Sequence, residues 1–308
     1  MEYQIDPHAH LGSEISRITA DGLDEALARL VVLSDKSDFD TEIHEVRKRC
    51  KELRAVARLI QPELTKSYGR FDMCIRDAAR KLSEARDAHV VLTTIEQVDI
   101  EADIETTGQL ERIREHRVGV AAEALATLRN SQRHLRGASS NLREAGRISA
   151  DWNVRDGFEA LATGIAATYR GARKGLARLR RTNDNDDVHE LRKSVKNLWY
   201  QTRLIELSAP SVLGPFATTL HTLSELLGDD HDRSVLMERI RSDRKRYGGK
   251  SAVQPAIRLA RDQQMAIRSS ALRLAATVLA EDDVAFGSRI RTYSRLTQDF
   301  GAEPRALR

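Results

Sequence analysis

The chain has 308 residues and a formal net charge of +4, from 50 Lys and Arg against 46 Asp and Glu. Only 6 Pro, 17 Gly and 5% aromatic residues leave few helix breakers and few rings on which bases could stack. Two cysteines exclude a disulfide framework, and no segment is apolar over the roughly 20 residues of a membrane helix. We therefore expect a soluble cytoplasmic protein.

Apolar residues recur at spacings of three and four through most of the chain, whereas alternating Val, Ile and Thr runs are scarce. This pattern predicts an all-α fold after a flexible N-terminal segment, residues 1–13. The expected helices span 14–33, 40–60, 66–82, 85–98, 109–147, 154–181, 187–208, 211–227, 231–247, 253–280 and 282–298. Asp40 and Asp187 are expected to cap helices, and Gly228 to end one.

A shift of 145 residues aligns HEVRKRCKELRAVARLI, from His44, with HELRKSVKNLWYQTRLI, from His189. Residues 41–94 and 186–239 share 14 identities in 54 positions, including a following Leu-x4-Asp-x2-Val. The match predicts a duplication, with two four-helix-bundle repeats at 14–150 and 151–308 related by a pseudo-twofold axis.

Each repeated motif carries basic residues along one helix face that has no carboxylate of its own. Like charges on one face repel by tenths of a kcal/mol per pair, so an uninterrupted basic face indicates an absent anion rather than a merely solvated surface. The first face has His44, Arg47, Lys48, Lys51, Arg58 and, at its edge, Arg54; the second has His189, Arg192, Lys193, Lys196 and Arg203. Trp199 and Tyr200 stand in the second copy where the first has Arg54 and Ala55, so Trp199 either shortens the basic track or adds a packing contact.

Further basic stripes are weaker candidates for anion binding, because a helix face that simply contacts water explains each of them more readily. One follows the second half's first helix, with Arg170, Arg173, Lys174, Arg178 and Arg181; others are Arg129, Arg133, Arg136, Arg143 and Arg147, and Arg258, Arg261 and Arg268. The chain has no zinc finger, glycine-rich phosphate loop or RNA-binding aromatic motif. A polymer of phosphate without bases would be sufficient to neutralise these basic faces.

The two His-centred motifs, followed by SEARDAHVVL and LGDDHDRSVL, resemble the CHAD family, the conserved histidine α-helical domain, over roughly residues 14–298. The resemblance implies two four-helix bundles whose basic side chains line a groove or pore and bind inorganic polyphosphate without catalysis. It places ligand binding on the basic residues of both motifs, and we add Arg170, Arg173 and Lys174 of the adjoining helix. No strand with alternating Glu and Lys is present, so the resemblance is to a stand-alone module without the triphosphate-tunnel enzyme.

The resemblance also implies partners: polyphosphate itself, with polyphosphate granules or polyphosphate-metabolising enzymes as further candidates. No cofactor, metal or membrane is expected, and a nucleic-acid or ribosome-associated binder is the alternative. His44 lies among cations that should disfavour its protonation until a polyanion binds. The competing hypothesis is a neutral histidine that orders the bundle interface.

Two acidic motifs suggest a metal-dependent hydrolase, the third alternative. Asp6-Pro7-His8-Ala9-His10 matches an amidohydrolase metal motif, but that motif ends a barrel strand and this chain predicts none. Helix capping after Gly228 explains Asp229-Asp230-His231-Asp232 better than a metal site does. We expect Asp87 and its counterpart Asp232 to cap a helix or to form a salt bridge with a basic side chain. Cys50 and Cys74 are expected to fill the core, and His89, His116, His134 and His221 receive no role.

Overall fold

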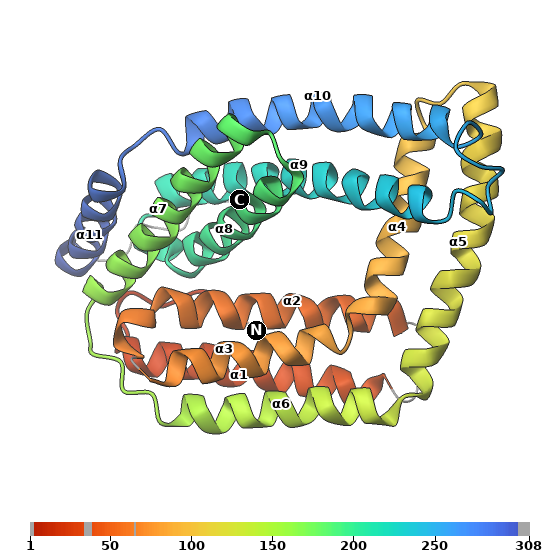
Figure 1. Ribbon diagram of the computed structural model, residues 1–308. Helices are drawn as coiled ribbons and strands as arrows, with labels where there is room; N and C mark the ends of the chain where they lie inside the picture. Colours follow the sequence, from red (N-terminus) through yellow and green to blue (C-terminus); the bar gives the residue numbers. More distant parts are fainter. Residues whose placement is uncertain (1–2, 34–38, 65, 301–308) are drawn as a thin grey trace.

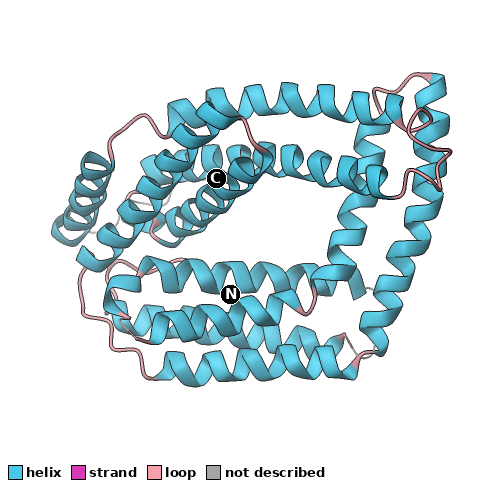
Figure 2. Ribbon diagram, viewed as in Figure 1, coloured by secondary structure: helices cyan, strands magenta, loops and turns pink. Residues whose placement is uncertain are grey.

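The computed structural model describes residues 3–33, 39–64 and 66–300. These residues form eleven α-helices and two short 3-10 helices, Gln61–Glu63 and Glu206–Ser208, with no strand among them (Figure 2). The all-α prediction is confirmed. No helix in the described ranges combines the length and the apolar character needed to cross a membrane.

Four helices form one layered unit at the bottom of Figure 1: α1 (Leu11–Val32), α2 (Phe39–Leu59), α3 (Ser67–Arg80) and α6 (Gln132–Ala150). The 3.6-residue repeat puts the apolar residues of each helix on one stripe, and these stripes meet in the main core. In α2 the stripe includes Cys50, which is 1% exposed, as the sequence predicted for a core residue.

The second unit contains α7 (Glu159–Thr182), α8 (Asn185–Leu204), α9 (Pro210–Ser242) and α10 (Gln254–Val278), with α11 (Asp283–Phe300) packed against α7. Helix α2 packs directly against both α8 and α7, so the two units share one continuous core (Figure 1). This contact places the two repeated motifs on neighbouring helices.

The helices α4 (Ser83–Asp99) and α5 (Ile104–Asn130) form an antiparallel pair that connects the two units at the right of Figure 1. A second core lies there, where Val91 and Ile95 of α4 meet the buried side chains of α9 and α10. The pair therefore holds the far ends of α9 and α10 relative to the first unit.

Two expected helix boundaries are wrong. The expected helix 109–147 is divided at Ser131, whose φ of −91° and ψ of 78° leave the helical region and whose hydroxyl caps α6 by accepting from the His134 backbone N–H. Conversely, α9 continues through Gly228, which ends no helix. The guanidinium of Arg192 lies against Gly228, where an added Cβ would be 3.5 Å from its Nε. This is an ordinary van der Waals distance, so neither a turn nor close packing requires a glycine here.

The expectation of a flexible N-terminal segment is also wrong for residues 3–10. Tyr3 and Ile5 are only 5% and 2% exposed, and the Ile5 backbone N–H donates to the carbonyl oxygen of Leu204. The Tyr3 hydroxyl donates to the carbonyl oxygen of Glu52. Because these apolar side chains and backbone groups have partners in both units, the segment is ordered by tertiary contacts that sequence periodicity does not register.

The helix bounds agree with a 145-residue shift, although the duplication itself stays a prediction. Moved by 145, α2 would span 184–204, close to the observed bounds of α8, and α5 would span 249–275, close to those of α10. The helices α3 and α4 together correspond to the single long helix α9. The break after Arg80 is thus a difference between the halves.

Candidate functional site

A cavity of about 390 Å³ lies between α2 and α8. Seven of the fourteen site residues predicted from the sequence line it, from both motifs: Lys51, Arg54, Arg58, His189, Arg192, Lys193 and Lys196. The sequence interpretation treated the motifs as two separate basic faces. The α2–α8 contact joins them, because the apolar stripe of each helix packs inward and leaves the basic face directed along the same groove.

The centre of the site consists of like charges from both helices. The pKa of the Lys51 amino group is lowered to about 7. Desolvation by the surrounding protein is the main cause, and the positive charges of Lys196, Arg47 and Arg192 act in the same direction. Burial and the charge of Arg192 likewise lower the pKa of Lys196. Lys51 nevertheless remains exposed to solvent, so it lines a concave surface that an anion can reach. Such a concentration of cations creates a strongly positive local potential despite the small net charge.

Carboxylates from neighbouring helices reach the basic residues, which the sequence argument about uninterrupted faces did not anticipate. Arg54 forms a two-point ion pair with Asp72 of α3, at 2.7 Å and 3.2 Å. Arg47 lies 3.9 Å from Asp87 of α4 and donates to the carbonyl oxygen of Ala79. The predicted role of Asp87 as the partner of a basic side chain is therefore confirmed, whereas Arg54 has its charge largely neutralised.

Asp232 corresponds to Asp87 in the second repeat and lies inside α9, so it does not cap a helix. Burial raises the pKa of its carboxyl group, and the charge of Arg192 opposes that rise. The Nε of Arg192 is buried and has no hydrogen-bond partner within the described ranges. Arg192 is thus held beside α9 by packing and charge rather than by a complete set of hydrogen bonds.

The two motif histidines have depressed pKa values. Desolvation, followed by the charges of Arg86 and Lys51, lowers the pKa of His44. Desolvation also lowers the pKa of His189, whose ring lies 4.6 Å from that of His231 and whose Nδ1 is buried without a partner in the described chain. Both histidines are therefore biased toward the neutral form in the free protein, in the direction predicted for His44.

Arg86 of α4 is a functional candidate that the sequence analysis missed. Its guanidinium contacts Asp40 at 3.4 Å, and its charge lowers the pKa of His44, Lys51 and Arg47. Its position immediately before Asp87, a residue that recurs in the second repeat, is the sequence feature that could have identified it. Only the packing of α4 against α2 brings it to the site.

Arg203 lies outside the cavity between α2 and α8. Its guanidinium forms an ion pair with Glu52 at 3.6 Å and lies 5.4 Å from the ring centres of both Tyr3 and Trp199. The alternatives left open for Trp199 are thus resolved toward a packing contact with Arg203. Lys48, which also does not line this cavity, lies 3.4 Å from Glu45.

The three candidate residues on α7 are not brought to the cavity. Arg170 and Arg173 form ion pairs with Asp283 at the start of α11, at 2.6 Å and 3.7 Å. Lys174 is exposed on the same helix and does not line the cavity. The acids that neutralise this stripe come from a later helix, so the absence of carboxylates within α7 was misleading.

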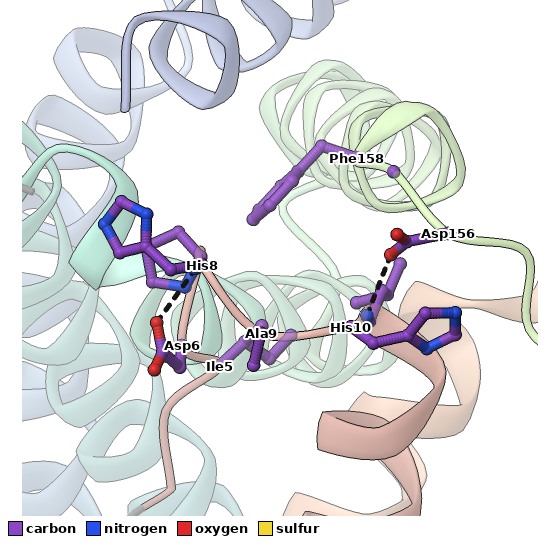
Figure 3. Close-up of a pocket in the computed structure, with 10 residues that line it drawn as sticks. Ile5, Asp6, His8, Ala9, His10, Asp156 and Phe158 are labelled. Carbon is purple, nitrogen blue, oxygen red and sulfur yellow. Dashed lines mark hydrogen bonds between the residues drawn. The ribbon is translucent and has the colours of Figure 1, made fainter. Parts of the chain in front are cut away.

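The motif from Asp6 to His10 forms a separate pocket of about 270 Å³ near the start of α7. Figure 3 shows His8 beside Asp6, and His10 beside Asp156 some way from them. Asp6 accepts from the His8 backbone N–H, and Asp156 accepts from the Leu11 backbone N–H. The carboxylates therefore order the backbone, and no three His, Cys, Asp or Glu side chains in the described ranges are arranged to hold a metal ion.

The second acidic motif, Asp229 to Asp232, lies in the interior of α9, and the predicted capping role is wrong. Asp230 is completely buried and accepts from Arg268 of α10 at 2.8 Å. Arg268 also donates to Asn183, the left-handed residue that ends α7, and to Asn185 at the start of α8. This network fixes the α7–α8 turn against α9 and α10.

Comparisons with known proteins agree with this architecture. The CHAD domain model matches residues 21–241. A crystal structure of the CHAD domain from the plant Ricinus communis is similar, with a TM-score of 0.55 and 19% sequence identity, over 100% of this chain and 96% of that one. No curated protein matches. Because the family model covers more than half of the chain, the protein belongs to the CHAD domain family.

Proposed function

We propose that this protein binds inorganic polyphosphate between α2 and α8 and does not hydrolyse it. The observation that carries the proposal is the meeting of Lys51 and Lys196 beside Arg47 and Arg192. Mutual repulsion at this position disfavours the free state, and a flexible polyanion would relieve it. The lysines supply point charges and the arginines planar donors, both of which suit phosphate oxygens.

Several observations favour a bare phosphate polymer over a nucleic acid. Among the described residues, Tyr200 is the one Phe, Trp or Tyr that lines the cavity, and it is 3% exposed, so it offers no free platform for a base. Trp199 is engaged by Arg203 and Lys196. Phosphate contacts without base contacts give affinity without sequence recognition. A cytoplasmic role beside polyphosphate granules or polyphosphate-metabolising enzymes is part of the proposal.

The proposal is tested by retardation of long-chain polyphosphate and of RNA at several salt concentrations, together with assays of phosphate release in Mg²⁺ and Mn²⁺. We expect retention of polyphosphate at salt concentrations that release RNA, and no phosphate release. Equal retention of RNA would favour the nucleic-acid alternative. Turnover with either metal would contradict binding without hydrolysis and favour the metal-dependent phosphohydrolase.

A further inference from the structure

Arg58 and Arg203 occupy matching positions in the two motif copies, but their surroundings differ. Arg203 has an ion pair with Glu52 and two aromatic rings against its guanidinium. Within the part of the chain that the structure describes, the Arg58 guanidinium makes no ion pair or hydrogen bond, and it lines two neighbouring cavities. One arginine is therefore committed to the fold, and the other is available to a ligand.

Aromatic residues close the Arg203 side. The second copy has Trp199 and Tyr200 where the first has Arg54 and Ala55. The Trp199 and Tyr200 rings lie 4.5 Å apart, and Tyr3 of the N-terminal segment packs edge-on against Tyr200 at 6.2 Å. The matching positions of the first copy carry no ring, because Arg54 pairs there with Asp72 and Ala55 is completely buried.

The buried charges near Arg203 also differ from those near Arg58. Glu52 is 2% exposed and pairs with Arg49 as well as with Arg203. At the positions matching Glu52 and Arg49, the second copy has Asn197 and Ser194, both of which line the cavity between α2 and α8. A buried carboxylate therefore stands beside Arg203, whereas small neutral groups occupy the matching positions near Arg58.

A second cavity, of about 640 Å³, adjoins the first on the Arg58 side and shares Arg58 and Ser194 with it. Its walls are the end of α2, the 3-10 helix that follows it, the start of α3, one face of α7 and Ser194 of α8. The remaining lining residues are Gln61, Pro62, Tyr68, Gly164, Ala167, Thr168 and Gly171. None of the described residues that line this cavity is acidic.

We propose that the anion site is one-sided: a polyphosphate chain held at Lys51 and Lys196 continues past Arg58 into the cavity along α7, and not past Arg203. This inference rests on the proposed function. The free guanidinium of Arg58 can donate hydrogen bonds to a phosphate oxygen, whereas the Arg203 guanidinium is already paired with a buried carboxylate. Chains long enough to enter the second cavity should therefore gain affinity over tripolyphosphate.

Gly171 offers a direct test because it is exposed and a Cβ there would make only an ordinary contact, 3.9 Å from the Ser194 Oγ. We expect Gly171→Glu to weaken long-chain polyphosphate about tenfold by placing a negative charge in the path, and Gly171→Lys to strengthen it. Tripolyphosphate binding should change less than about twofold on the same electrostatic argument. Gly119→Glu is the matched control, because Gly119 is exposed on α5 with open space around it.

The affinities are measured by titration calorimetry with the full chain, and thermal unfolding checks that each variant is folded. Arg58→Gln should weaken long-chain binding more than Arg203→Gln does. An unchanged affinity of Gly171→Glu, or an equal loss for tripolyphosphate and long chains, would overturn the one-sided path. Failure of the wild-type chain to bind either ligand would instead overturn the proposed function on which this inference rests.

Discussion

Lys51 of α2 and Lys196 of α8 lie on facing helices, close enough for the charge of Lys196 to help lower the pKa of Lys51 to about 7. The two residues are separated by 145 positions in the sequence and meet only because α2 packs against α8. Neither amino group has a carboxylate within ion-pair distance in the described ranges. This approach of like charges has measurable consequences.

Polyanion binding should be accompanied by proton uptake at Lys51. The pKa of this amino group in the free protein is about 7, below the ordinary lysine value of 10.5, so at pH 8 much of it is neutral. A bound polyanion reverses the local potential and restores the charged form. Calorimetry at pH 8 in buffers of different ionisation enthalpy should show net uptake in the wild type. Lys51→Arg, which stays charged, should bind without it.

His44 provides a second titrating group at lower pH. Because its pKa is depressed below 6.5 in the free protein, binding should also draw a proton onto His44 near pH 6. His44→Gln should reduce uptake near pH 6, where Lys51 is mostly charged already, and leave uptake at pH 8 unchanged. If the wild type and His44→Gln take up the same number of protons near pH 6, the histidine orders the bundle and does not act as a switch.

Asp72 should act as an internal competitor of the ligand. Its two-point contact with Arg54 neutralises one of the cavity's cations. Asp72→Asn should therefore raise polyphosphate affinity several-fold, while losing about 1 kcal/mol of stability. Asp77→Asn is the control, because it removes a carboxylate from the same helix at a partly exposed ion pair that does not involve a cavity residue. Equal gains from both substitutions would mean that net charge, and not Arg54, sets the affinity.

The network around Asp230 should dominate the stability of the second unit. Arg268→Met leaves a completely buried carboxylate without its cation, which costs about 3–5 kcal/mol in the free energy of unfolding. Arg147→Met removes an exposed pair with Glu144 and should cost less than about 1 kcal/mol. Chemical denaturation measures both. Similar losses in the two variants would show that the buried pair is not a principal support of the fold.

Salt dependence should report the number of phosphate contacts. Removal of two cations by Lys51→Ala/Lys196→Ala should reduce the slope of log affinity against log salt by about 1.4, the value for two contacts on a single-stranded polyanion. The slope is obtained from titrations at four or five salt concentrations. An unchanged slope would place these lysines outside the ligand contact.

The helical fold and the motif faces were predictable from local patterns. The apolar stripe of α2 is almost fully buried, and three basic residues of the same helix, Lys51, Arg54 and Arg58, line the cavity. Helix ends were less predictable, since Gly228 lies inside a continuous helix and Ser131 divides two helices, and a periodic pattern distinguishes neither case. Tyr3 and Ile5 were missed because a short apolar segment gains its order only from distant partners.

The charges that neighbours contribute could not be predicted. Asp72, Asp87 and Arg86 reach α2 from α3 and α4 and decide which of its cations remain available. Asp283 does the same for Arg170 and Arg173 of α7. A basic helix face without carboxylates of its own therefore indicates an anion site only if neighbouring helices supply no carboxylates either.

The most direct test compares two double substitutions that each remove two basic side chains. Lys51→Ala/Lys196→Ala changes the facing lysines, and Arg133→Ala/Arg136→Ala changes exposed residues of α6. Titration with long-chain polyphosphate should show at least a tenfold loss of affinity, about 1.4 kcal/mol, for the first pair and little change for the second. Equal losses would contradict a local site between α2 and α8 and assign any binding to the protein's overall basic surface.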